Sequence, residues 1–293
     1  MQVFSTIGLT GKPDDAAVTD TIQRIADHLR GRGCTVIVDG RTVPDHVAGD
    51  CERTGATPLA ERVDLLVAIG GDGTLLTAAH TVAGSEVPIL GVNRGRLGFL
   101  VDVSPGDFAE IDKVLEGQYT ADDRMMLSAE LRDGEGRVLD AGIALNDVVL
   151  HKWHTARMIE FETWIDGQLC NQYRSDGLII STPTGSTAYA MSGGGPILHP
   201  DVDAMALVPI CPHTLSNRPL VISAGSHIEI RMPGDQMAQI RLSCDSQKNL
   251  EPVPGASVHV RRHDAPVHLL HPPGYQYFDI LRAKLRWGDG HPV

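Results

Sequence analysis

Three glycines surround one aspartate in the stretch Gly70-Gly71-Asp72-Gly73-Thr74. The preceding run, residues 63–69, is largely apolar without two-residue alternation, which predicts a strand buried on both faces of a parallel sheet. Residues 75–80 are mostly good helix formers. A glycine turn between such a strand and helix lets the backbone approach a phosphate, and the helix N-terminus favours an anion. We therefore predict a phosphate-binding loop made of Gly70, Gly71, Gly73 and Thr74.

Asp72 places a negative charge in the same loop, where it would repel a bound phosphate. Three roles would justify a carboxylate there: capping the following helix, holding a metal ion, or accepting a proton from a hydroxyl group. The residue types alone leave all three roles open.

The composition limits the classes of function. The chain has 293 residues and a net charge of −12, which argues against nucleic acid as the main partner because a polyanion needs a basic face. No apolar run approaches a membrane span, and the first residues show no signal peptide, so we expect a cytoplasmic protein without a membrane partner. The five cysteines are scattered without a CxxC pair, which is typical of reduced thiols in a cytosolic protein.

The first part of the chain alternates strands and helices. We expect strands at 2–9, 35–38, 63–69 and 87–92 and helices at 15–30 and 75–80, and this alternation predicts an α/β domain over residues 1–101 with a parallel, Rossmann-like sheet. The loop Gly11-Lys12-Pro13-Asp14 has anion-friendly chemistry but is neither a Walker A loop nor a GxGxxG fingerprint. The strand 87–92 also runs into a glycine loop, residues 93–100, and two such strand ends side by side would frame one crevice.

The character of the sequence changes after residue 101. A short helix is expected at 108–115, and we then predict a mostly β domain over residues 102–274, consisting of two packed sheets. Its expected strands are 128–131, 141–150, 159–165, 178–181, 220–223, 227–232, 239–243 and 257–261. The tail, residues 275–293, is expected to pack back on the first domain.

A second polar group of residues runs from Arg174 to Tyr189, in the order RSDGLIISTPTGSTAY. Hydroxyl side chains and open backbone amides suit contacts to ribose, phosphate and base edges. Gly193-Gly194-Gly195-Pro196 adds another tight approach of the backbone. The alternative is a hydroxyl-rich turn that caps the following helix, and the run by itself does not decide between the two.

Together, the GGDGT stretch, Asn146-Asp147 and the run from Asp176 to Pro196 resemble the NAD kinases, in particular those of Gram-negative bacteria. The GGDGT stretch alone also resembles diacylglycerol, sphingosine and phosphofructokinase-type enzymes. The Asp176–Pro196 run is more specific, and the resemblance extends over nearly the whole chain.

The resemblance implies that Asp72 is the catalytic group and that Asp72 and Gly73 line the NAD site. It implies further NAD contacts from the second domain, namely Asn146, Asp147, Arg157, Arg174, Asp176, Thr184, Thr187, Ala188, Tyr189, Ala190, Met191, Ser192 and Gln247. One position departs from the pattern of some family members, because Thr77 stands where they carry a basic residue.

The implied reaction is ATP-dependent phosphorylation of the 2′-hydroxyl of the adenosine ribose of NAD, which gives NADP. Mg²⁺ or another divalent cation would arrive with ATP, and no dedicated protein metal site is expected. The resemblance also implies self-association as a dimer or tetramer, with part of each site supplied by a neighbour. Two other hypotheses remain: a lipid or sphingoid kinase that shares the GGDGT stretch, and a non-catalytic NAD(H)-binding sensor.

Overall fold

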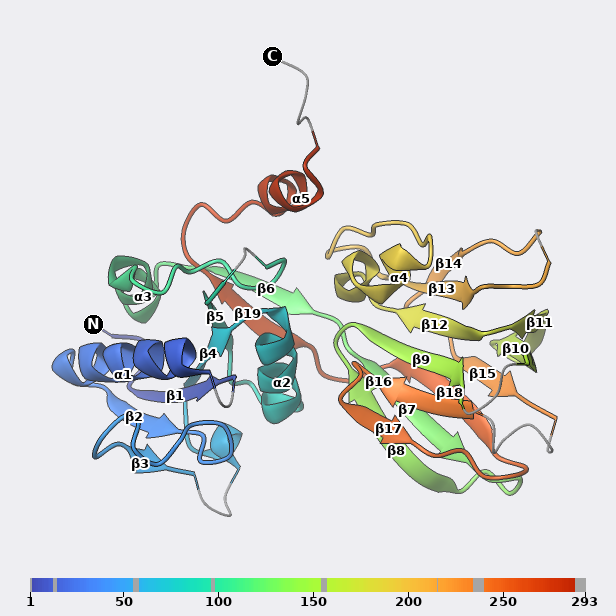
Figure 1. Ribbon diagram of the computed structural model, residues 1–293, viewed down its shortest axis with the longest axis horizontal. Coiled ribbons are helices and arrows are strands. Elements are labelled where there is room, and N and C mark those ends of the chain that lie inside the picture. The colour runs from blue at the N-terminus through green and yellow to red at the C-terminus, as the bar shows by residue number, and fades with distance from the viewer. Residues whose placement is uncertain are drawn as a thin grey trace. The chain divides into compact units, whose positions relative to one another are not determined.

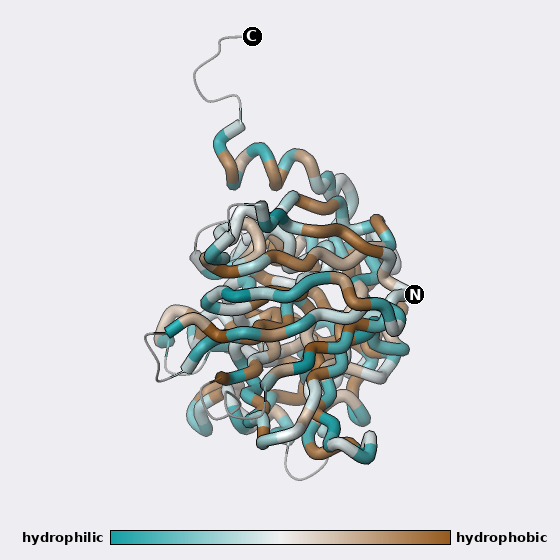
Figure 2. Tube along the Cα trace, turned by 90° about the vertical axis from the view of Figure 1, so that its right-hand side faces the viewer, coloured by the Kyte–Doolittle hydropathy of each residue, from teal (hydrophilic) through white to brown (hydrophobic). Residues whose placement is uncertain are grey.

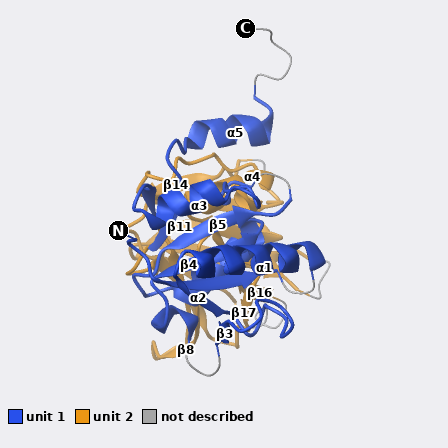
Figure 3. Cartoon of the chain, turned by 90° about the vertical axis from the view of Figure 1, so that its left-hand side faces the viewer, with its two compact units in different colours: residues 1–123, 267–293 blue, residues 124–266 orange. Residues whose placement is uncertain are grey.

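A computed structural model describes residues 2–12, 15–54, 58–95, 98–153, 157–214, 216–233 and 240–287. The chain forms two compact units, which Figure 3 shows in different colours. Unit 1 comprises residues 1–123 and 267–293, and unit 2 comprises residues 124–266. Unit 1 is built on a largely parallel sheet with helices and unit 2 on two antiparallel sheets, so the predicted fold class is confirmed.

Unit 1 contains a seven-stranded sheet in the order β3-β2-β1-β4-β5-β19-β6, whose elements are labelled in Figure 1. Its strands are β1 (Thr6–Gly11), β2 (Thr35–Val38), β3 (Glu52–Arg53), β4 (Leu65–Gly70), β5 (Ile89–Asn93), β6 (Thr120–Arg124) and β19 (Val267–His271). Its helices are α1 (Ala16–Gly31), η1 (Leu59–Glu61), α2 (Asp72–Val82), α3 (Phe108–Leu115) and α5 (Tyr277–Leu285).

The helix α1 shows how the sequence specifies these elements. The carboxylate of Asp15 caps the helix by accepting hydrogen bonds from the backbone amides of Ala17 and Val18. One apolar face, which includes Ile22, Ile25 and Leu29, is buried in the core of unit 1. All six residues of β4 are buried, as its continuous apolar run predicts.

The strand order of unit 1 changes direction at β1. The chain places β2 and β3 on one side of β1 and then β4 and β5 on the other side. In open α/β sheets, ligands bind beyond the carboxyl ends of the strands at such a switch point. The strand β1 ends at Gly11 and β4 ends at Gly70, so the loops that follow these two strands lie at the switch point.

Unit 2 consists of two six-stranded antiparallel sheets, ordered β11-β10-β15-β18-β7-β8 and β14-β13-β12-β9-β16-β17. The first contains β7 (Leu127–Arg132), β8 (Val138–Ala144), β10 (Ile159–Ile165), β11 (Gln168–Ser175), β15 (Ile228–Arg231) and β18 (Ser257–Arg262). The second contains β9 (Asp147–Lys152), β12 (Gly177–Ser181), β13 (Ala204–Ile210), β14 (Leu220–Ser223), β16 (Ile240–Cys244) and β17 (Lys248–Leu250). A 3₁₀ turn η2 (Thr184–Thr187) and a short helix α4 (Tyr189–Ser192) follow β12.

The hydrophobic core of unit 2 is formed by side chains of both sheets. Residues alternate between buried and more exposed along β7, and alternating colours can be followed along the strands in Figure 2. Buried side chains of both sheets form one cluster, which includes Leu131, Phe161, Leu178 and Leu242. The other face of the second sheet packs against Ala190 of α4, so it also positions the segment after β12.

Two differences from the sequence-based expectations concern the site. The predicted strand 141–150 is two strands, β8 and β9, because the chain turns between Ala144 and Asp147. The predicted domain boundaries after residues 101 and 274 differ from the division of the structure, since α3 packs into the core of unit 1 and β19 pairs in parallel with β5. The long-range return of β19 leaves no local signal in the sequence.

His271, at the end of β19, links three segments of unit 1. Its side chain is 1 % exposed, and its Nδ1 lies 3.1 Å from the Oδ2 of Asp102. Its Nε2 lies 3.4 Å from the Oδ2 of Asp122, and its ring stacks on Tyr275. Burial alone would lower the pKa of His271, but the two carboxylates outweigh burial and the pKa is raised above its ordinary value.

We expect His271→Gln to destabilise the protein more at about pH 6 than at about pH 9. A raised histidine pKa contributes stability that is present below the unfolded-state value of about 6.5 and is lost as the pH rises through the folded-state value. Free energies of unfolding from urea titrations at the two pH values would measure the change. His46→Gln, at an exposed histidine of the same unit, is the control. An equal loss for His271→Gln at both pH values would contradict the proposed charge on this histidine.

Candidate functional site

The GGDGT stretch lies at the carboxyl end of β4, as predicted. Gly70 is the last residue of the strand, Gly71 is the N-cap of α2, and Asp72 is the first residue of that helix. Gly73 and Thr74 follow in its first turn. The amide of Arg94, which follows β5, donates to the carbonyl of Gly70 at 2.7 Å. The structure therefore brings together the two glycine loops that follow β4 and β5.

The carboxylate of Asp72 holds the second of these loops. Its Oδ2 accepts a hydrogen bond from the backbone amide of Phe99 and its Oδ1 accepts one from Leu100, each at 3.0 Å. Gly98 is required beside them, because a Cβ at this position would overlap the Oδ1 of Asp72. Gly71 is the N-cap of α2, and the two oxygens of Asp72 bond the loop after β5, so the side chain of Asp72 anchors that loop. The side chain therefore has a fixed direction at the carboxyl edge of the sheet.

Thr77 gives no positive charge to this edge. Its hydroxyl donates to the carbonyl of Gly73 at 3.2 Å, within α2. Thr77 therefore does not supply the positive charge that a basic residue gives some family members at this position.

In unit 2, Leu145 and Asn146 form the turn between β8 and β9, and Asp147 is the first residue of β9. One carboxylate holds this turn. Asp245 accepts hydrogen bonds from three consecutive backbone amides, those of Leu145 at 2.7 Å, Asn146 at 2.8 Å and Asp147 at 3.1 Å. The amide of Asp245 in turn donates to the carbonyl of Asp147 at 3.0 Å. Asp245 and Ser246 have φ values of 51° and 56°, a left-handed conformation that is uncommon for residues with side chains.

The Asp147 carboxyl group has an unusual environment. The residue is 5 % exposed, and its side chain makes no hydrogen bond with any residue that the structure describes. Burial and the negative charge of Asp245 raise the pKa of Asp147 to about 7. The group therefore changes its charge near neutral pH.

The loop after β12 packs directly on the Asn146 turn. The Thr182 hydroxyl donates to the carbonyl of Leu145 at 2.5 Å, and the Thr182 amide donates to that of Asn146 at 2.9 Å. Gly185 lies so close that a Cβ there would overlap the carbonyl oxygen of Asn146. The structure thus joins two predicted site segments that are about 35 residues apart in the sequence.

The residues of η2 and α4 differ in accessibility. Thr184, Thr187 and Ala190 are buried, and the Oγ1 of Thr184 accepts a hydrogen bond from the Nη1 of Arg124 at 3.3 Å. Ala188 and Met191 are half-buried and Ser192 is exposed. Tyr189 is 47 % exposed, so its ring is not part of the hydrophobic core.

The remaining predicted residues of unit 2 lie in two places. Gln247 belongs to the hairpin turn that also carries Asp245, and its amide donates to the carbonyl of Cys244 at 2.9 Å. Asp176 lies at the opposite end of β12 from Thr182, where it pairs with Lys152 at 2.8 Å. At about 3.4 Å per residue, the strand separates these two ends by roughly 15–20 Å.

Arg174 belongs to the same distant end, two residues before Asp176. Its Nε lies 3.7 Å from the Oε1 of Glu160, and both residues line a cavity of about 550 Å³ on the first sheet of unit 2. Arg157 is exposed, two residues before β10. The structure therefore does not bring Arg174 or Asp176 together with Asn146 within one chain.

Three further residues shape these sites although the sequence did not indicate them: Asp245, Gly98 and Arg124. Asp245 stands two residues before the predicted Gln247, but its hydrogen-bond partners lie about 100 residues earlier in the chain. Gly98 was noted only as part of a glycine loop. Arg124 is a buried cation among polar residues, and only its burial in the structure distinguishes it from a surface arginine.

The described residues contain no group of three or more histidine, cysteine, aspartate or glutamate side chains that could hold a metal ion. The sequence also contains two histidine pairs with spacings that a metal could use, His151 with His154 and His259 with His263. His259 instead hydrogen-bonds Ser257 at 2.9 Å and His227 at 3.0 Å. His154 lies outside the described residues.

Family models match both parts of the chain. The ATP-NAD kinase N-terminal domain matches residues 7–122, and the ATP-NAD kinase C-terminal domain matches residues 145–271. The chain belongs to the NAD kinase family. Its relatives include NAD kinases of the Gram-negative bacteria Halorhodospira halophila, 51 % identical over 97 % of this chain and 94 % of the relative, and Acinetobacter baylyi, 47 % identical over 98 % and 93 %.

Two solved structures of NAD kinase-type proteins share the fold. The yeast NADH kinase complexed with NADH superposes with a TM-score of 0.89, at 24 % identity over 99 % of this chain and 89 % of that chain. An NAD kinase from Archaeoglobus fulgidus in complex with ATP superposes with a TM-score of 0.74, at 24 % identity over 96 % and 98 %.

For this NAD kinase, we expect Asp245→Asn to lower the pKa of Asp147, because the substitution removes the neighbouring negative charge. The asparagine can still accept at one oxygen but sets an amide donor against a buried backbone N–H, which costs about 1–3 kcal/mol. A carbon-13 NMR titration of the Asp147 carboxyl group would measure the pKa.

Asp166→Asn is the matched control for that titration. Asp166 also has a left-handed φ, of 50°, and also accepts a distant backbone amide, from His227 at 2.8 Å. This control is expected to leave the pKa of Asp147 unchanged. An unchanged pKa in Asp245→Asn as well would show that Asp245 does not act on Asp147.

Proposed function

We propose that this NAD kinase transfers the γ-phosphoryl group of ATP to the 2′-hydroxyl of the adenosine ribose of NAD⁺, with Asp72 as the general base. The bond from the ribose oxygen to phosphorus forms, the bond from phosphorus to ADP breaks, and the hydroxyl proton passes to the carboxylate of Asp72. The matched relatives are NAD kinases, and they support neither a lipid or sphingoid kinase nor a non-catalytic sensor.

The observation that carries this proposal is the fixed carboxylate of Asp72 at the end of β4. Two backbone amides orient its oxygens, and each carboxylate oxygen retains further acceptor capacity for a hydroxyl proton. Phosphoryl transfer depends mainly on positioning and charge stabilisation, so a base held by the backbone suits this reaction.

We assign NAD binding in unit 2 to the joined loops around Asn146 and to α4. Asn146 offers a donor and an acceptor to the adenine edge, and Asp147 would accept a hydrogen bond from a ribose hydroxyl. The exposed ring of Tyr189 offers a flat face to a base or nicotinamide ring. Thr184, Thr187 and Ala190 are buried, which favours a supporting role for their side chains.

Arg157, Arg174 and Asp176 are proposed to serve the NAD site of a neighbouring copy in a dimer or tetramer. Support comes from the separation between the two ends of β12, because Arg174 and Asp176 lie at the end remote from Asn146. Self-association would allow both groups of residues to contribute to one site.

Mg²⁺ is proposed to enter as a complex with ATP. The described residues offer no group of protein ligands that could hold it alone, and Mg²⁺ in kinase sites is commonly held by substrate phosphates, waters and one or two carboxylates. When bound, the ion would neutralise charge on the phosphates.

A cytoplasmic location is also part of the proposal. No helix that the structure describes is long and apolar enough to cross a membrane. The net charge of −12 disfavours nucleic acid as a partner.

We expect Asp72→Asn to reduce turnover by on the order of 10² or more, because asparagine cannot accept the proton. Formation of NADP⁺ from ATP and NAD⁺, followed in a coupled assay, measures the loss. Assays that cross ATP and inorganic polyphosphate with NAD⁺ and NADH would define the donor and the acceptor.

Asp64→Asn provides a matched control for the structural part of this substitution. Asp64 also accepts two consecutive backbone amides, from Ser5 at 2.9 Å and Thr6 at 3.0 Å, but it lies at the amino end of β4. Both variants lose one amide acceptor, so their thermal stabilities should fall by similar amounts. If both variants kept turnover within a few-fold of the unmodified chain, Asp72 would be only an anchor for the loop after β5.

A further inference from the structure

A lysine, Lys12, lies at the carboxyl end of β1. Lys12 follows Gly11 directly and is exposed, and its ammonium group makes no hydrogen bond or ion pair with any residue that the structure describes. Gly11 pairs with Ile69 of β4, one residue before Gly70. Lys12 therefore lies at the switch point of the unit 1 sheet, beside the strand that leads to Asp72.

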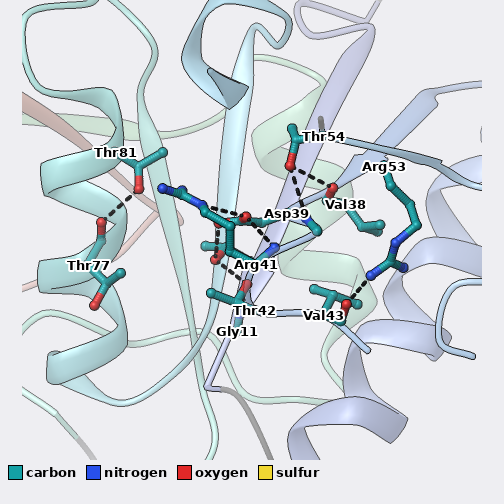
Figure 4. A network of polar contacts seen from close by, with 12 residues as sticks. Gly11, Val38, Asp39, Arg41, Thr42, Val43, Arg53, Thr54, Thr77 and Thr81 are labelled. Carbon is teal, nitrogen blue, oxygen red and sulfur yellow. Dashed lines mark hydrogen bonds and ion pairs between the residues drawn. The ribbon is translucent and has the colours of Figure 1, made fainter. Parts of the chain in front are cut away.

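A second cation is held at the same edge by a buried acid. Asp39, which follows β2, has a side chain only 1 % exposed, whereas that of Arg41 is 70 % exposed. The Nε and Nη2 of Arg41 donate to the two oxygens of Asp39, each at 3.0 Å, and the Arg41 amide adds a third bond at 3.0 Å. Figure 4 shows this pair beside Gly11.

The loop that carries Arg41 is also tied to β1. The Thr42 hydroxyl lies 3.0 Å from that of Thr10 and 3.5 Å from the amide of Gly11. The Thr10 hydroxyl also donates to Asp39 at 3.4 Å. Together these contacts fix the loop after β2 over the end of β1, and the contact between Thr42 and Gly11 can be followed in Figure 4.

The arrangement leaves Arg41 able to bind an anion. A guanidinium group has five N–H donors, and the two side-chain bonds to Asp39 leave three for another ligand. The anchored planar group loses little further freedom on binding a phosphate. Lys12 adds a mobile point charge, and the N-terminus of α2 begins beyond the adjacent strand.

We propose that the polyphosphate chain of the phosphoryl donor binds at this switch point, held by Lys12 and Arg41. The ligand class is a nucleoside triphosphate or another linear polyphosphate. Two cations spaced along a sheet edge suit a ligand with a chain of several negative charges better than they suit a ligand with a single carboxylate. This inference rests on the proposed function, because it assigns the donor side of the same reaction.

The test compares Lys12→Gln and Arg41→Gln with Arg62→Gln. Arg62 is also an arginine of unit 1 paired with a carboxylate, that of Glu52, but it lies before the amino end of β4. We expect each of the first two variants to raise KM for ATP by about tenfold or more, from the loss of a charge-assisted contact, and to leave KM for NAD⁺ within about twofold. Arg62→Gln should change neither constant.

Inorganic tripolyphosphate provides a second readout that needs no turnover. Its binding to the unmodified chain, measured by calorimetry, should weaken by about tenfold or more in Lys12→Gln, a variant that removes no hydrogen bond or ion pair with any described residue. Thermal unfolding of Arg41→Gln would report the separate cost of leaving Asp39 without its partner.

The outcomes separate this inference from the proposed function. An unmodified chain that makes no NADP⁺ would contradict the function, whereas the tripolyphosphate titration would still test the site. NADP⁺ formation with an unchanged KM for ATP in Lys12→Gln would overturn the inference alone. A lower unfolding temperature of Arg41→Gln combined with an unchanged KM for ATP would assign Arg41 to the neutralisation of Asp39 and overturn its role here.

Discussion

Carboxylates that accept consecutive backbone amides hold the loops of this protein at the ends of its strands. Asp72 binds the amides of residues 99 and 100, and Asp245 binds those of residues 145–147. Such bonds are charge-assisted and about twice as strong as bonds between neutral groups. They also give a loop without regular structure a defined shape, since each backbone amide is directed at a fixed oxygen.

The same bonds determine the chemistry proposed for the site. The bonds that anchor the loop after β5 also orient the carboxylate of Asp72, so one group can serve as both anchor and base. In unit 2, Asp245 shapes the Asn146 turn, and its charge adds to burial in raising the pKa of Asp147. At the edge of β1, the buried Asp39 orients Arg41 in a similar way. Positioning and electrostatics therefore come from the same few acids.

The sequence was informative where the signal was local. The apolar run and glycines around Asp72 predicted the strand, turn and helix, and residues 35–38 and 108–115 form the expected strand and helix. It was not informative where the partners lie far apart. Asp245 contacts a turn about 100 residues earlier, and β19 pairs with β5 although the whole of unit 2 separates them in the sequence. The strand expected over 141–150 was broken by that same turn, and the remote position of Asp176 depends on the antiparallel register of β9 and β12.

These carboxylates should shape the two loops before any substrate binds. Amide hydrogen exchange of residues 98–100 and 145–147, measured in the ligand-free chain and its variants, tests it most directly. Both segments should exchange slowly in the unmodified chain. Asp72→Asn should accelerate exchange only in the first segment and Asp245→Asn only in the second. Rapid exchange of both segments in the unmodified chain, slowed only by added NAD⁺, would show that the substrate and not the carboxylates orders these loops.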